Sequence, residues 1–168
     1  MASKGSPLFP PPFEEAIRRH EREVMRFILR STGDRDDAMD LFQETWLRAY
    51  RAYPSFKPDA GFRPWIFQIA ANLCRNHARG RARRGRLFIS NLDGAAGINS
   101  DLGVGGDHAE LLNLKRNLAR LPHAQGKALM MRKLGGLEYR EIGSALNCSE
   151  ESARASVYKA LKKLKAAR

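Results

Sequence analysis

Six residues between positions 65 and 79 have the types and the spacing needed to hold single-stranded nucleic acid. They recur every three or four positions and so fall on one side of a helix: Trp65, Gln68, Asn72, Arg75, Asn76 and Arg79. A tryptophan ring stacks on an unpaired base, amides read base edges and arginines hold phosphates. The pattern also fits a helix whose tryptophan is buried and whose polar groups are only solvated.

The basic run that follows favours nucleic acid. Six arginines and no acid lie within twelve residues: Arg75, Arg79, Arg81, Arg83, Arg84 and Arg86. Such density favours phosphate contacts that weaken with salt. The whole chain shares this bias, with 30 Lys and Arg against 18 Asp and Glu, a net charge of +12 and a pI near 10.3. A polyanionic partner is therefore expected.

An acidic helix precedes this segment, and its polar side carries Asp37, Asp40, Gln43, Glu44 and Arg48. Acids repel DNA, so this side suits a basic protein partner, although a solvated helix face has the same pattern. Periodicity does not choose between the two.

The C-terminal segment predicts a helix-turn-helix. A short helix over about Tyr139 to Leu146 and a turn at 147–149 lead into a long last helix. Its outward side is basic, with Arg154, Lys159, Lys162, Lys163 and Lys165, and no acid follows Glu151. Lysines near a helix end also favour the macrodipole, but the turn favours a helix in a major groove flanked by phosphates.

These segments need helices to position them, and no strand is demanded anywhere. A first helix from Phe13 should end at Gly33, a second capped by Asp34 should reach about Tyr53, and a third should run from Pro64 to about Gly80. The expected apolar positions of the first helix are Phe13, Ile17, Val24, Phe27 and Ile28. The expected apolar stripe of the second helix is Ala38, Leu41, Phe42, Thr45 and Ala49, and the expected buried stripe of the third is Ile66, Ile69, Ala70, Leu73 and His77. In the last helices, Leu137, Ile142, Ala145 and Leu146 should pack on Ala153, Val157, Ala160, Leu161 and Leu164.

The chain divides into four parts. We expect a disordered arm over 1–12, a helical domain over 13–88, a flexible acidic linker over 89–106 and a second helical domain over 107–168. The predicted fold is all-α, with a bundle of three to four helices followed by a four-helix domain that contains the helix-turn-helix. Their relative arrangement is left open.

Several classes of protein are disfavoured. No apolar run approaches a membrane span or a signal-peptide core, so a cytoplasmic protein without membrane insertion is expected. Cys74 and His77 form a C-x-x-H pair without two further ligands, and neither Cys74 nor Cys148 suggests a disulfide framework. There is no carboxylate cluster, no nucleophile with a paired base and no phosphate-binding loop, so no enzyme, cofactor, metal or small-molecule substrate is predicted.

Three stretches resemble the extracytoplasmic-function (ECF) sigma factors, small members of the bacterial sigma-70 superfamily. DAMDLFQETWLRAYRAYPSF with FRPWIFQIAANLCRNHARGRARR is similar to the family's N-terminal promoter-melting domain, region 2. LARLPHAQGKALMMRKLGGLEYREIGSALNCS is similar to the opening of its C-terminal domain, region 4. The resemblance implies a non-catalytic initiation factor that carries RNA polymerase to promoter DNA.

The resemblance also assigns residues. It implies that Asp40, Gln43, Glu44 and Leu47 dock on the clamp helices of the largest polymerase subunit. It implies that the third helix, through the six residues from Trp65 to Arg79, captures the melting minus-ten strand. The last helix would read the minus-thirty-five duplex through Ser152, Arg154, Ala155, Ser156, Lys159 and Lys162. An anti-sigma partner is common in the family, and such a partner could hold the factor at the membrane.

The chain departs from the family pattern in two places. Glu151 to Ser156 stand where the family usually has Gly-Thr-Val-Lys-Ser-Arg, and Gly143 stands where alanine is frequent. Glycine there should weaken the short helix by up to about 1 kcal/mol. The alternative function is a helix-turn-helix regulator that binds duplex DNA without polymerase and uses its N-terminal bundle for interactions.

Overall fold

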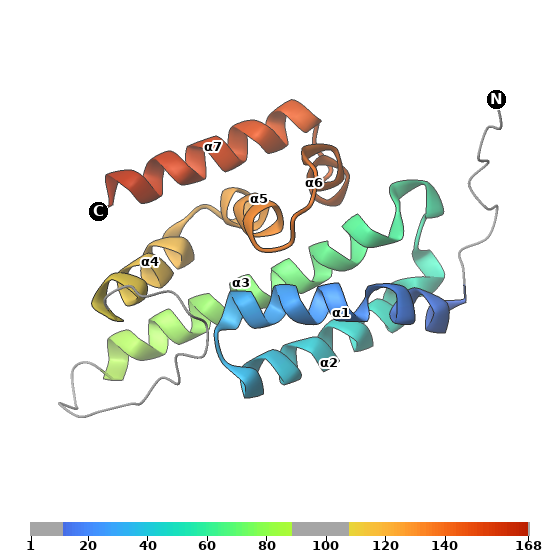
Figure 1. Ribbon diagram of the computed structural model, residues 1–168, viewed down its shortest axis with the longest axis horizontal. Coiled ribbons are helices and arrows are strands. Elements are labelled where there is room, and N and C mark those ends of the chain that lie inside the picture. Colours follow the sequence, from blue (N-terminus) through green and yellow to red (C-terminus); the bar gives the residue numbers. More distant parts are fainter. Residues whose placement is uncertain (1–11, 89–107, 168) are drawn as a thin grey trace.

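The computed structural model describes residues 12–88 and 108–167, and these residues contain helices and no strand. The expected linker, 89–106, and the expected arm up to residue 11 lie outside the described residues. The α-helices are α1 Phe13–Thr32, α2 Arg35–Ala52, α3 Phe62–Phe88, α4 His108–Arg120, α5 His123–Lys133, α6 Tyr139–Leu146 and α7 Glu150–Ala166 (Figure 1). Two 3-10 turns, η1 Tyr53–Ser55 and η2 Pro58–Ala60, lie between α2 and α3. The predicted all-α class is confirmed.

The junction of α1 and α2 follows the predicted stop and cap. Gly33 takes a left-handed conformation with φ 69°, and its N–H donates to the carbonyl of Leu29 at 2.9 Å. The Asp34 carboxylate then accepts from the N–H of Asp37 at 2.9 Å. The two helices therefore reverse direction over a very short turn and pack against each other.

Three helix caps define the helix-turn-helix. Glu138 and Glu141 form a capping box at the start of α6, and Asn147 ends that helix in a left-handed conformation with φ 53°. The Ser149 hydroxyl then accepts from the N–H of Ser152 at 3.1 Å and caps α7. The predicted bounds of α6 are confirmed, and the predicted turn at 147–149 separates it from α7.

Helix α3 is longer than the sequence predicted. It begins at Phe62 rather than Pro64, and it continues through the arginine run to Phe88 rather than ending near Gly80. A single interior glycine costs a helix only about 1 kcal/mol, and arginine is a good helix former. The arginine run from Arg75 therefore lies on a helix from end to end.

The two halves of the chain share one core. Helix α3 packs on α1 and α2 along one side and on α4, α5 and α6 along another, so it lies between the two halves in Figure 1. Of its predicted buried residues, Ile66, Ala70 and Leu73 are buried, whereas Ile69 and His77 are only half-buried. A second set that the prediction did not include is also buried: Phe67, Ala71 and Cys74. One continuous cluster of buried side chains joins Phe27 of α1 to Val157 of α7.

Polar contacts cross this seam between the halves. The Arg63 guanidinium holds Glu23 of α1 at 2.9 Å and Glu141 of α6 at 2.7 Å. Arg30 donates to the Leu134 carbonyl at 3.3 Å, and the Ser144 hydroxyl donates to the Ala60 carbonyl at 3.0 Å. Burial raises the pKa of the Glu141 carboxyl, but hydrogen bonds from Arg63 and from the Glu138 N–H outweigh it, so the net shift is downward.

Gly143 occupies a position that has no space for a side chain, which corrects the expectation that it merely weakens α6. A Cβ at this position would lie 2.7 Å from the Cys148 carbonyl oxygen and 3.2 Å from the Ser149 carbonyl carbon. The turn closes here because the Cys148 N–H donates to the Gly143 carbonyl at 2.8 Å. The glycine therefore permits the tight approach of the turn to α6.

No helix in the described ranges is both long enough and apolar enough to cross a membrane.

The Gly143→Ala substitution should lower stability although it raises helix propensity. The propensity gain of up to about 1 kcal/mol opposes a backbone clash, and overpacking typically costs about 1–3 kcal/mol. We expect a net fall in the free energy of unfolding, measured by urea denaturation. Gly80→Ala is the matched control, because among the described side chains the nearest atom to a Cβ there would be the Arg84 Nη2, at 4.0 Å. A G143A protein as stable as G80A would contradict this account.

Candidate nucleic-acid interface

The six residues of the α3 pattern do not share one exposed face. Asn76 is exposed, while Trp65, Gln68, Asn72 and Arg79 are half-buried. Arg75 is 1% exposed and is the largest fully buried side chain among the described residues. The expectation that all six present one open surface is therefore wrong for Arg75 in this arrangement.

The Arg75 side chain extends from α3, in the N-terminal half, into the C-terminal half of the molecule. Its Nη1 donates to the carbonyl of Leu118 and its Nη2 to the carbonyl of Leu121, each at 2.6 Å. These carbonyls lie at the C-terminal end of α4, where the macrodipole favours a cation. The Leu118 carbonyl also accepts from the Leu121 N–H at 3.3 Å. The physical reason for the burial is that α3 has neighbours on two sides, so its polar stripe is not all solvent-facing.

Further cations gather around Arg75. Burial, and then the neighbouring Arg79, lower the pKa of Arg75. Burial lowers the pKa of Lys127 on α5, with a further contribution from Arg75. Burial also lowers the pKa of His123, and Lys127, Arg75 and Arg79 add to that shift. This part of the seam is therefore positively charged on both sides.

Trp65 lies at the edge of an aromatic cluster. Its ring centroid is 4.8 Å from that of Phe56, 5.4 Å from Phe62 and 6.3 Å from Tyr53. The indole is thus positioned by other rings. The sequence allowed either a buried tryptophan or one that stacks on a base. Trp65 contributes to packing and still keeps part of its surface accessible.

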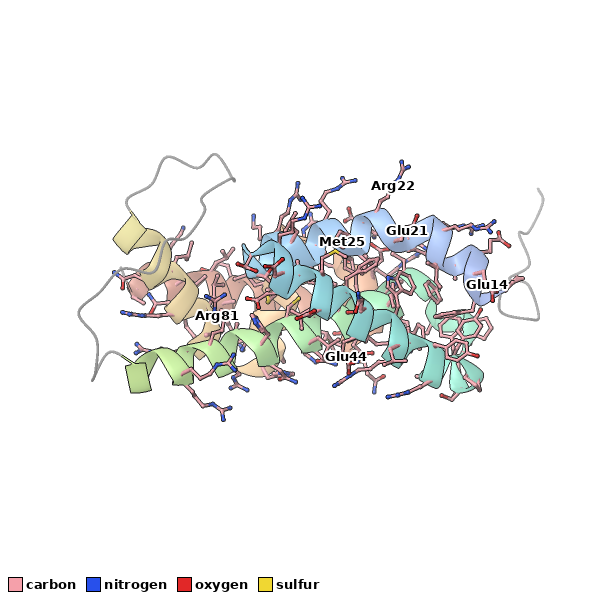
Figure 2. The ribbon with its side chains drawn as sticks, turned by 90° about the horizontal axis from the view of Figure 1, so that it is seen from below. Glu14, Glu21, Arg22, Met25, Glu44 and Arg81 are labelled. Carbon is pink, nitrogen blue, oxygen red and sulfur yellow. The ribbon has the colours of Figure 1, made fainter. Side chains whose placement is uncertain are left out.

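The predicted protein-binding surface on α2 is accessible. Asp40 and Gln43 are exposed, Leu47 is 43% exposed, and Glu44 is half-buried. Figure 2 shows this side of the molecule with Glu44 labelled. Glu44 pairs with Arg48 at 2.6 Å, an i,i+4 surface contact worth only about 0.3–0.5 kcal/mol. A partner could displace Arg48 at little cost. An acidic and partly apolar patch is therefore open on α2.

The residues predicted to read duplex DNA lie along α7 and are mostly exposed. Ser152, Arg154 and Ala155 are exposed, as are Lys159 and Lys162. Ser156 is half-buried, and the opposite side of the helix buries Ala153, Val157 and Ala160. The predicted packing of this helix on α6 is confirmed, and it leaves the basic side free.

Arg154 is held in place before any ligand arrives. Its guanidinium pairs with Glu150 at 3.0 Å and lies 4.9 Å from the Tyr139 ring centroid. Arg132 lies 4.8 Å from the centroid of the same ring. Cation–π contact and the ion pair restrict the conformations of Arg154. Glu150, in the first turn of α7, thus positions a basic side chain.

The residues that join the two halves, Arg63 and Glu141, were not predicted from the sequence, and neither was the role of Tyr139. No periodic signal marks Arg63 or Glu141, since their contact depends on how the halves pack. A signal for the second buried side of α3 was present in the spacing of Phe67, Ala71 and Cys74, which forms an apolar stripe of its own.

The two residues of the C-x-x-H pair, Cys74 and His77, interact with different neighbouring side chains. Burial raises the pKa of the Cys74 thiol to about 12, an effect that the neighbouring Ser31 hydroxyl partly offsets. His77 Nε2 lies 3.3 Å from Asp37 Oδ2. Within 12–88 and 108–167, no three His, Cys, Asp or Glu side chains form a group that could hold a metal.

Comparison with known proteins places both halves of the chain. Residues 16–84 match the family Sigma-70 region 2, and residues 111–164 match Sigma-70, region 4. The chain belongs to the sigma-70 family. Its curated relatives narrow this to the ECF sigma factors: it is a sigma factor for transcription initiation, as the resemblance implied.

Among the relatives is the RNA polymerase sigma-H factor of Pseudomonas aeruginosa, 26% identical over 157 residues, which cover 88% of this chain and 81% of that protein. The ECF RNA polymerase sigma-E factor of Escherichia coli strain K12 is 27% identical over 161 residues, with coverage of 88% and 82%.

Two solved structures have the same fold. CnrH in complex with the cytosolic domain of CnrY has a TM-score of 0.60, 25% identity, and coverage of 92% of this chain and 85% of that one. The sigma factor RpoE of Bartonella quintana, solved with the anti-sigma factor NepR, has a TM-score of 0.58, 21% identity, and coverage of 92% and 95%.

The lowered pKa of His123 predicts a pH dependence of stability. The unfolded chain binds the proton more readily than the folded chain, so the free energy of unfolding should fall as pH drops from about 7.5 to about 5.5, through the ordinary histidine pKa. Carboxyl groups titrate lower and contribute little in this window. His123→Gln should show a smaller fall in urea denaturation at the two pH values. An equal fall in the variant and the parent would show that His123 is not responsible.

Proposed function

We propose that this ECF sigma factor binds core RNA polymerase through α2, captures the minus-ten strand through α3 and reads the minus-thirty-five duplex through α7. In this proposal residues 13–88 act as region 2 and residues 107–168 as region 4. The observation that carries it is the separation of charge on one chain, with an accessible acidic patch on α2 and accessible basic sides on α3 and α7. Catalysis stays with the polymerase.

The α2 patch supports polymerase binding because it combines acids with an exposed leucine. Asp40, Gln43 and Glu44 supply charge and hydrogen bonds, and Leu47 supplies an apolar contact at their edge. Interfaces gain specificity and association rate from such charge complementarity, and they gain affinity from buried apolar anchors. A basic, partly apolar helical surface is the chemistry that this patch fits.

The α3 and α7 surfaces support two kinds of DNA binding. Asn76, Arg79 and the accessible part of Trp65 offer an amide, a cation and a ring, which suit an unpaired strand. Arg154, Lys159 and Lys162 stand along one side of a capped helix that follows a tight turn, which suits a major groove with its flanking phosphates.

We also infer an anti-sigma partner for this chain. RpoE of Bartonella quintana was solved with the anti-sigma factor NepR, and CnrH with the cytosolic domain of CnrY. A partner of that kind would compete with polymerase, and a membrane-bound one would hold the factor at the membrane.

The direct test is transcription by reconstituted polymerase. Purified protein added to core polymerase should start transcripts at a discrete set of genomic promoters, and mapping their 5′ ends should reveal a two-part promoter sequence. Duplex binding without transcription at any promoter would instead support a regulator that works without polymerase.

The α2 patch can be tested by Asp40→Ala, Gln43→Ala and Glu44→Ala combined. We expect affinity for core polymerase to fall at least about tenfold, as expected for residues central to an interface, with duplex binding retained. The control is Glu15→Ala combined with Glu21→Ala, which also removes two negative charges, but from α1. It should leave polymerase affinity unchanged. Equal affinities for the triple variant and the parent would remove α2 from the proposed interface.

The α7 surface can be tested by Lys159→Ala combined with Lys162→Ala. If both lysines neutralise phosphates, the slope of log affinity against log salt should become shallower by about 1.8, with weaker binding to all duplexes. Arg18→Ala combined with Arg22→Ala is the control of equal charge, because both residues are exposed on α1 and Arg22 projects outward (Figure 2). The same slope change in this control would mean that only net charge matters.

A further inference from the structure

The two DNA-facing halves are locked together at one seam. A promoter's minus-ten and minus-thirty-five elements lie about 25 base pairs apart, or roughly 85 Å of B-DNA. Here α3 packs directly on α5 and α6, which in turn pack on α7. The packed arrangement cannot place α3 and α7 on both elements at once, so the halves must separate for the proposed function.

Arg75 is the residue most changed by this packing. It belongs to the strand-capturing pattern, yet both of its Nη atoms are occupied by the carbonyls of Leu118 and Leu121. Its guanidinium also fills the space beside Gly126 on α5. A Cβ at position 126 would lie 2.4 Å from the Arg75 Cζ and Nη1 and 2.8 Å from its Nε. The seam therefore requires a glycine at 126.

Several polar contacts hold the seam closed, but some of its buried polar atoms make no hydrogen bond. Arg63 bridges to Glu141 and Ser144 bonds to the Ala60 carbonyl, so several polar contacts favour closure. Against this, three of the four buried side-chain atoms that make no hydrogen bond in the described part of the chain lie on α3 and α5: Asn72 Oδ1, Arg75 Nε and Gln125 Oε1. Buried polar atoms without partners are costly, and the cations Arg75, Arg79 and Lys127 repel each other across the seam.

We propose that this closed arrangement is autoinhibitory, with Arg75 withdrawn from promoter DNA into the end of α4 and Gly126 as the position that admits it. The inference rests on the proposed function for the role of Arg75 in strand capture. Opening the seam returns Arg75 to solvent and frees α7 to move away from α3. The residues from 89 to 107 can span up to about 65 Å when extended, so the halves can separate without breaking either fold.

Gly126→Ala tests the contact between Arg75 and Gly126 that closes the seam, which we call the latch. It is the smallest change that the chain allows at this contact. The added methyl group conflicts with Arg75 only when the seam is closed, and Arg75 cannot yield without giving up both carbonyls, since it is fully buried. The same substitution favours α5 as an isolated helix. Gly80→Ala is the matched control, because it makes the same change on α3 with nothing closer than the Arg84 Nη2 at 4.0 Å.

The readouts are the radius of gyration of the full chain by small-angle scattering and the protein concentration that gives half-maximal transcription with core polymerase. G126A should have a larger radius than the parent and G80A. If the closed form holds about nine molecules in ten, G126A should also need about tenfold less protein. A parent that is already extended, or a G126A protein as compact as G80A, overturns the proposal. An opened G126A that needs as much protein as the parent also overturns it.

A second variant covers the case in which G126A loses helix content by circular dichroism. Glu141→Gln combined with Ser144→Ala removes the ion pair to Arg63 and the bond to the Ala60 carbonyl, while the amide oxygen introduced in place of the Glu141 carboxylate can still accept from the Glu138 N–H. It should also enlarge the radius, and an unchanged radius would count against the latch. If neither the parent nor any variant supports transcription, the proposed function fails, while the scattering comparison still decides whether these contacts hold the closed arrangement.

Discussion

Helix α3 is the element on which the rest of the structure depends, because both halves of the chain bury side chains against it. Its buried side chains fall in two stripes, Ile66, Ala70 and Leu73 and then Phe67, Ala71 and Cys74, and one continuous core runs from this helix into both halves of the chain. Small domains bury only a modest fraction of their surface. Sharing one helix gives each half more buried area than it has alone.

Local chemistry in the sequence predicted the elements well. The Gly33 and Asp34 junction, the bounds of α6 and the buried side of α7 all follow from caps, turn residues and apolar spacing, which act within a few residues. The end of α3 was misplaced because Gly80 was given more weight as a helix terminator than its small energetic cost warrants. These are errors of boundary and not of type.

The candidate site was predicted less completely, and the reason is tertiary. Six polar residues at helical spacing indicate one face only if the helix has a single buried side, and α3 has two. Arg75 therefore differs from Arg79 although the pattern treats them alike. Gly143 is a second example. A side chain at this position would clash with the Cys148 carbonyl of the turn, and helical periodicity does not describe that turn. Contacts between distant segments, such as Arg63 with Glu141, leave no local signal.

The two cysteines differ sharply in their chemical environment. Cys74 is buried in the shared core and its thiol has a pKa of about 12, so it stays protonated at neutral pH and acts as a small packing group. Cys148 is exposed in the turn that precedes α7. Alkylating reagents and oxidants therefore meet one accessible thiol beside the DNA-facing helix, whereas modification of Cys74 requires the core itself to open. A single-site dye on Cys148 can consequently follow the C-terminal half in the native protein.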